Sequence, residues 1–73
     1  MAIVMYTKPG CPYCQAARDH YNSHGIDFTE YDAQNDVARK REMLELTKGD
    51  PTVPAIAENG VWTQSGWGDP PRG

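Results

Sequence analysis

The pattern of apolar and polar positions divides the chain into four short β-type segments and two helical segments. Ala2–Thr7 is apolar at almost every position, which is typical of a central strand buried on both faces. Thr52–Ala57 and Val61–Gln64 are shorter β-rich segments, and the Asn-Gly step within Glu58–Gly60 predicts a hairpin turn between them. A further strand is expected over Ile26–Asp32, where apolar and polar residues alternate loosely.

The first helical segment is expected to run from Pro12 to His24. Proline suits the first position of a helix, and Gly25 suits the position just after its end. The residues that recur at helical spacing and are expected to face the core are Cys14, Ala17 and Tyr21.

The second helical segment is expected over Val37–Lys48. Asn35 or Asp36 can cap its N-terminus, and the Gly-Asp-Pro sequence at 49–51 supplies the stop signals that end it. The residues expected on or near its buried face are Val37, Met43 and Leu44.

The expected order of elements is therefore β-α-β-α-β-β, an α/β fold. A strand-helix-strand unit favours parallel pairing of the first two strands, whereas the hairpin makes the last two antiparallel. These rules predict a four-stranded mixed sheet in a single domain over residues 1–73, a length at which only about 60% of the unfolded surface is buried. Residues from about 65 to 73 form a tail rich in glycine and proline that we expect to be irregular, without a final helix.

Charge and hydropathy exclude several classes of partner. The net charge is −3 and no basic stripe is present, which argues against nucleic-acid binding. The longest apolar run, Ala2–Tyr6, is far too short to span a bilayer and lacks the flanking features of a signal peptide. We therefore expect a cytoplasmic protein with no membrane contact, and nothing in the sequence demands more than a monomer.

The chain has two cysteines, Cys11 and Cys14, at the expected junction of the first strand and first helix. A disulfide across so short a loop would stabilise the fold little, so a structural role is disfavoured. Backbone N–H groups and the helix dipole favour a thiolate at Cys11, and nearby Lys8 adds positive charge. Cys14 lies one turn further on and is positioned to attack a disulfide formed at Cys11, which predicts a dithiol redox catalyst.

Zinc binding is the main rival for these cysteines, because His20 and His24 follow on the same helical segment. The spacer between the cysteines and the histidines is far shorter than in zinc fingers. If the segment is helical, Cys14 and His20 face different sides of it. We therefore expect no metal site and interpret both histidines as residues that face solvent.

The sequence Lys-Pro-Gly-Cys-Pro-Tyr-Cys at 8–14, joined to Thr-Val-Pro at 52–54, resembles glutaredoxin, a thioredoxin-fold disulfide oxidoreductase. The resemblance extends over roughly residues 2–69. It implies reduction of protein disulfides and glutathione mixed disulfides, with glutathione as co-substrate and no bound cofactor. The implied partners are glutathione and proteins that carry a disulfide or a glutathionyl group. It also implies a cis peptide bond before Pro54.

The resemblance further implies a set of glutathione-binding residues. Lys8 and Arg41 correspond to side chains that meet the glycine carboxylate, whereas Asp69 corresponds to the acid that holds the γ-glutamyl ammonium. For Arg41 the alternative is a solvated helix face paired with acidic neighbours. The full implied set is Lys8, Tyr13, Arg41, Thr52, Val53, Pro54 and Asp69.

Two other functions remain open at this point. The Ser-Gly-Trp sequence at 65–67 is similar to the end of the short redoxins that donate electrons to ribonucleotide reductase and are reduced by thioredoxin reductase. The family resemblance also allows a carrier of a metal or an iron–sulfur cluster, with two Cys11 thiolates and two glutathiones as ligands across a dimer. For Trp67 itself, both a place in the substrate groove and a place over the core are open, and we favour the groove.

Overall fold

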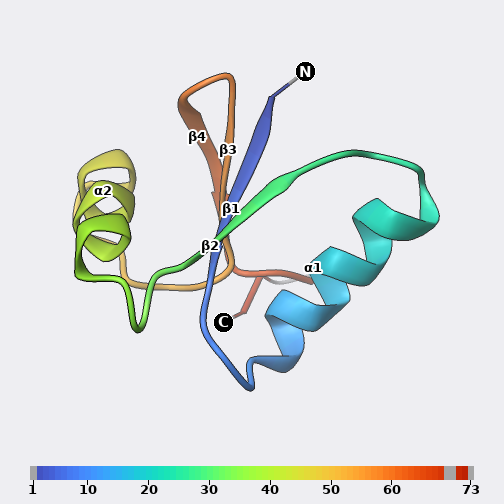
Figure 1. Ribbon diagram of the computed structural model, residues 1–73, viewed down its shortest axis with the longest axis horizontal. Coiled ribbons are helices and arrows are strands. Elements are labelled where there is room, and N and C mark those ends of the chain that lie inside the picture. The colour runs from blue at the N-terminus through green and yellow to red at the C-terminus, as the bar shows by residue number, and fades with distance from the viewer. Residues whose placement is uncertain (1, 69–70, 73) are drawn as a thin grey trace.

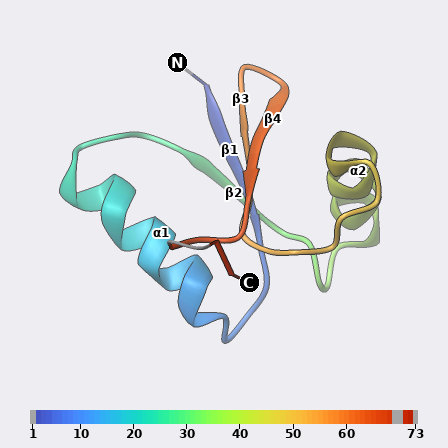
Figure 2. The same ribbon diagram turned by 180° about the vertical axis from the view of Figure 1, so that it is seen from behind.

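The computed structural model describes residues 2–68 and 71–72, which form a four-stranded sheet with one helix on each face (Figure 1). Viewed from behind, α1 and α2 again lie on opposite sides of the sheet, and the C-terminal tail runs toward α1 (Figure 2). The elements in chain order are β1 (Ile3–Thr7), α1 (Pro12–Ser23), β2 (Thr29–Asp32), α2 (Val37–Thr47), β3 (Ala55–Glu58) and β4 (Val61–Ser65).

The sheet has the order β2-β1-β3-β4 and is mixed, as the sequence predicts. β1 pairs parallel to β2 and antiparallel to β3, and β3 and β4 form the expected antiparallel hairpin. Met5 lies opposite Glu30 and Ile56, whereas the next residue, Tyr6, lies opposite Tyr31 and Ala55. Because successive residues of a strand point to opposite faces, this register separates the side chains that meet α1 from those that meet α2.

Two groups of buried side chains fill the two faces. One group packs β1 and β3 against α1 and the C-terminal tail; its fully buried members in the sheet are Met5 and Ile56. The other packs the sheet against α2 and extends to the cysteine pair, with Met43 as its main contribution from α2. The first group is Ile3, Met5, Ala17, Tyr21 and Ile56, and the second is Tyr6, Cys11, Cys14, Ala33, Met43, Val53 and Ala55.

The ends of the helices follow the expected capping rules. Asp36 caps α2 by accepting a hydrogen bond from the backbone N–H of Arg39 at 3.2 Å. Gly25 follows α1 with a φ of 65°, the left-handed conformation that glycine adopts readily. α2 ends one residue earlier than predicted, because Lys48 already has a left-handed φ of 58°.

Three strands begin later than the sequence predicts, and β1 differs least, since it begins at Ile3 rather than Ala2. β2 begins at Thr29 rather than Ile26, and β3 begins at Ala55 rather than Thr52. Before β3, the backbone N–H of Thr52 donates to the Asp50 carboxylate at 2.9 Å, so it is bonded within the loop rather than to a neighbouring strand. Proline at 54 has no N–H to donate to the sheet.

Two predictions about packing are wrong. Val37 is 71% exposed, because it lies about 240° around α2 from Met43, and the helix buries Met43 and Thr47 instead. Trp67, for which we favoured a place in a groove, covers the core on the α1 side, and its ring centroid lies 5.8 Å from that of Tyr21. The tail is also more regular than expected, since Trp67 and Arg72 exchange backbone hydrogen bonds of 2.7 and 3.0 Å.

Candidate functional site

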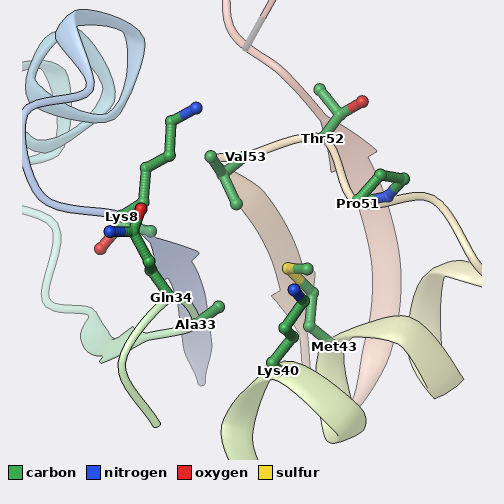
Figure 3. A pocket seen from close by; sticks show the side chains of 9 residues that line it. Lys8, Ala33, Gln34, Lys40, Met43, Pro51, Thr52 and Val53 are labelled. Carbon is green, nitrogen blue, oxygen red and sulfur yellow. The ribbon is translucent and has the colours of Figure 1, made fainter. Parts of the chain in front are cut away.

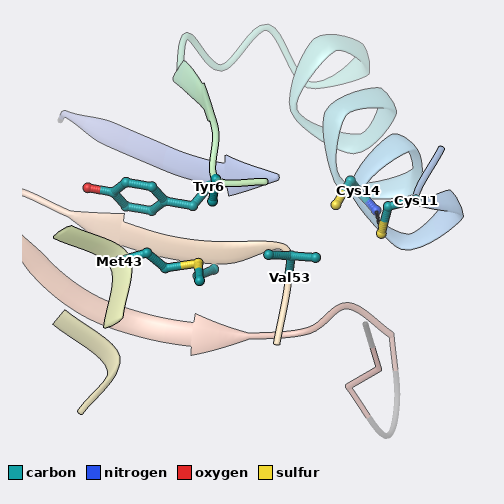
Figure 4. Close-up of a cluster of buried hydrophobic side chains, with 7 residues drawn as sticks. Tyr6, Cys11, Cys14, Met43 and Val53 are labelled. Carbon is teal, nitrogen blue, oxygen red and sulfur yellow. Dashed lines mark hydrogen bonds between the residues drawn. The ribbon is translucent and has the colours of Figure 1, made fainter. Parts of the chain in front are cut away.

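The cysteine pair lies at the N-terminus of α1, where the chain turns from β1 into the helix. Gly10 allows this turn with a φ of 73°, and Pro12 occupies the first turn of the helix. Cys11 is the N-cap residue, and its Sγ accepts a hydrogen bond from the backbone N–H of Cys14 at 3.3 Å (Figure 4). A negative charge on this sulfur would therefore lie beside an N–H donor and the positive end of the helix dipole.

The two thiols have different surroundings. Both are free, but Cys11 is 6% exposed and borders a hollow on the surface, whereas Cys14 is completely buried. Burial, followed by the hydrogen bond with Cys11, raises the pKa of the Cys14 thiol to about 12. Cys14 is therefore protonated at neutral pH, and Cys11 is the sulfur that an incoming substrate reaches first.

A groove of about 320 Å³ lies between the end of β1, the loop before β3 and α2 (Figure 3). Lys8 borders it on one side and Lys40 on another, while Thr52 and Val53 form the wall that precedes β3. Within residues 2–68 and 71–72, neither lysine takes part in an ion pair. The groove therefore offers two ammonium groups to an anionic ligand. Its full lining is Thr7, Lys8, Ala33, Gln34, Lys40, Met43, Pro51, Thr52 and Val53.

The structure connects this groove to the cysteines through Val53. Val53 is buried in the same cluster as Cys11 and Cys14, and it also lines the groove (Figure 4). The Val53–Pro54 peptide bond is cis, which confirms what the resemblance implies. Tyr13 packs partly buried against this cluster and does not line the groove.

Arg41 lies outside the groove. It borders a different surface hollow with Val37 and Leu44, which Lys40 also borders, and only Lys40 reaches the groove as well. Lys40, to which the sequence patterns assigned no role, faces the groove in its place. Asp69 lies outside the described residues, so its predicted role stays a prediction.

A second hollow, of about 430 Å³, borders Cys11 on the side of α1 and includes Lys8 and Arg18. The Arg18 guanidinium forms an ion pair with Glu30 on β2, with an Nε–Oε1 distance of 2.8 Å. The hydroxyl of Thr7 donates to the same carboxylate at 2.7 Å. The hydrogen bond from Arg18 is the main reason that the pKa of Glu30 is lowered. Sequence patterns gave no sign of this contact, since it joins elements that meet only in the folded chain.

Neither a metal cluster nor a membrane span is evident in the part of the chain that the structure describes. There, His, Cys, Asp and Glu side chains do not gather in groups of three or more that could hold a metal ion. Likewise, neither helix is long and apolar enough to cross a bilayer.

We predict that alkylation will separate the two thiols. At about pH 7, iodoacetamide should modify Cys11 in the folded protein, because the buried Cys14 is protonated. Cys14 should react only after unfolding, as followed by mass spectrometry of the peptides. The Cys11→Ser protein is the control and should take up no label while folded. Equal labelling of both cysteines in the native chain would contradict the geometry.

Comparison with known proteins identifies the family and agrees with the fold. The family model described as Glutaredoxin matches residues 3–62. Glutaredoxin 3 of Escherichia coli strain K12 is 37% identical over 54 residues, which cover 74% of this chain and 64% of the relative. The match thus spans less than two thirds of the relative's length.

Solved structures show the same fold at low sequence identity. The thioredoxin-like protein BC3987 superposes with a TM-score of 0.80 at 22% identity, covering 93% of this chain and 90% of its own. A buckwheat glutaredoxin, crystallised as a glutathione complex, superposes with a TM-score of 0.72 at 20% identity. The superposition covers 86% of this chain and 59% of the buckwheat chain. The fold is therefore thioredoxin-like, and the chain belongs to the glutaredoxin family.

Proposed function

We propose that this protein is a glutathione-dependent thiol–disulfide oxidoreductase that reduces protein disulfides and glutathione mixed disulfides. The observation that carries the proposal is the arrangement of its two thiols. Cys11 sits at the N-cap with its sulfur near the surface, and Cys14 lies buried one turn behind it with an N–H directed at that sulfur. Membership of the glutaredoxin family supports the same chemistry.

In the first half of the reaction, the Cys11 thiolate attacks one sulfur of the substrate disulfide. The other sulfur leaves as a thiolate and takes up a proton, so that the substrate remains attached to Cys11 through a mixed disulfide. Cys14 then gives up its proton and attacks the Cys11 sulfur, which releases the second substrate thiol. The substrate has gained two electrons, and the protein has lost two in forming the Cys11–Cys14 bond.

Two glutathione molecules restore the dithiol in the second half. The first attacks the Cys11 sulfur, which releases Cys14 as a thiol and leaves glutathione on Cys11. The second attacks that glutathionyl sulfur, which releases glutathione disulfide and the Cys11 thiolate. When the substrate is itself glutathionylated, Cys11 alone suffices, because the first attack already gives glutathionyl-Cys11.

The groove beside Val53 is the proposed glutathione site. Lys8 and Lys40 border it, and their ammonium groups are complementary to the carboxylates of glutathione. The backbone of Val53 can pair with the extended peptide, as an added strand pairs with a sheet edge. The buckwheat glutaredoxin, solved as a complex with glutathione, supports glutathione as the ligand. In this proposal Lys40 takes the role that the sequence resemblance implied for Arg41.

The proposed protein partners are those with an exposed disulfide or a glutathionyl group, in a reducing compartment such as the cytoplasm. Reduction of ribonucleotide reductase, with thioredoxin reductase as electron donor, rests on the Ser-Gly-Trp sequence alone. In the structure Trp67 from that sequence packs on α1, so no contact of the described tail favours this alternative.

Substitution of each cysteine tests the proposed order of attack. The Cys11→Ser protein should lose both activities, because the other thiol, Cys14, is completely buried. The Cys14→Ser protein should keep reduction of a glutathionylated peptide and lose reduction of a protein disulfide by the dithiol route. NADPH consumption coupled to glutathione reductase measures both reactions. Undiminished activity of the Cys11→Ser protein would sink the proposal.

A matched pair of substitutions on α2 tests the glutathione groove. Lys40→Ala should raise the KM for glutathione a few-fold, because an exposed ion pair contributes about 0.2–1 kcal/mol. Arg41→Ala removes the same charge from the adjacent position, which lies outside the groove, and should leave the KM almost unchanged. Steady-state kinetics at varied glutathione concentration measures both. A larger effect for Arg41→Ala would show that the groove has been assigned to the wrong cation.

A further inference from the structure

The two histidines of the chain lie one helical turn apart at the C-terminal end of α1. His24 is the C-cap residue, and its backbone N–H donates to the carbonyl of His20 at 3.2 Å, so the last helical hydrogen bond joins the two residues. Their rings are exposed, and the ring centroids are 4.2 Å apart with a tilt of 32°. Residues four apart on a helix project from the same side, so both imidazoles face the same region of solvent.

The hydrogen bonding of His24 leaves one ring nitrogen available. Its Nδ1 lies 2.8 Å from the carbonyl oxygen of His20, which can only accept, so Nδ1 carries the proton. The hydroxyl of Ser23 is also near, at 3.3 Å from Nδ1. In neutral imidazole the other nitrogen, Nε2, then holds a free lone pair. A ring N–H bonded to a backbone carbonyl is the usual support of a histidine that binds a metal through its second nitrogen.

The position of the pair also suits a cation. The carbonyl end of a helix carries partial negative charge, and the chain as a whole has a net charge of −3. Two ligands of one ion at about 2.0–2.1 Å each can come from rings this close together. Imidazole suits copper, nickel and zinc, and Cu²⁺ binds most tightly to a given nitrogen site among the first-row divalent ions.

We propose that His20 and His24 form a two-histidine binding site for a divalent transition-metal ion, with the highest affinity for Cu²⁺. Among the described residues no third His, Cys, Asp or Glu joins the pair, so water completes the coordination of the ion. The site is separate from the cysteines, because His20 is about 240° around α1 from the buried Cys14. It is independent of the proposed oxidoreductase activity.

A nearby aromatic ring provides a direct signal for binding. The ring of Trp67 lies 5.3 Å from that of His20, so a paramagnetic Cu²⁺ ion at the pair should quench its fluorescence. The chain has one other tryptophan, Trp62, which Trp62→Phe removes. Cys11→Ser and Cys14→Ser remove the thiols, which would otherwise bind or reduce copper. Titration of the full-length variant that carries all three substitutions with Cu²⁺, by fluorescence and by calorimetry, tests the site.

We expect one Cu²⁺ per chain, weaker binding of Zn²⁺ and Ni²⁺, and reversal by a chelator. His20→Gln and His24→Gln should each weaken Cu²⁺ binding at least about 10-fold, since loss of even an outer partner of a metal ligand typically costs 10–100-fold. Asn22→Ala, an exposed change between the two histidines, is the matched control and should leave the affinity unchanged. Circular dichroism confirms that each variant is folded. Cu²⁺ binding that survives both histidine substitutions, or no binding up to about 1 mM, would overturn the proposal.

Discussion

The hydrogen bond from the Cys14 N–H to the Cys11 sulfur is the interaction on which the proposed chemistry depends. It exists because the chain turns sharply at Gly10 and enters α1 at Pro12, which puts a cysteine at the N-cap where serine or aspartate more often stands. The same geometry buries Cys14 one turn further on. One local turn thus creates an accessible sulfur near backbone donors and a protected sulfur behind it.

Polar contacts to the sheet hold both helices that carry the site. Arg18 on α1 is paired with Glu30 on β2. On the other face, the Tyr6 hydroxyl donates to Glu42 on α2, and burial, together with this hydrogen bond, raises the pKa of Tyr6. Arg39 lies with its guanidinium carbon 3.7 Å from the centroid of the Tyr31 ring. Because Arg39 and Glu42 flank Lys40, these contacts also fix the turn of α2 that borders the groove.

Local rules predicted most of the fold but not all of the site. The sequence predicts the β3–β4 hairpin, the helix caps and the position of Cys11 well, because each of these features depends on residues close together in the chain. The sequence does not predict whether Lys40 or Arg41 faces the groove. One step along a helix turns a side chain by about 100°, and only packing against the sheet fixes the rotation of the helix. The packing of Trp67 on α1 and the Arg18–Glu30 ion pair were not predicted for the same reason, because tertiary contacts determine the partners of these side chains.

Reduction of the Cys11–Cys14 disulfide by competing electron donors tests the central claim most directly. The oxidised protein is mixed with glutathione and glutathione reductase, or with thioredoxin reductase and NADPH, and thiol formation is followed in time. Our account predicts fast reduction by glutathione, because the groove beside Val53 carries two lysines suited to its carboxylates. Reduction by thioredoxin reductase alone would contradict the assignment of that groove and favour a redoxin of the ribonucleotide-reductase type.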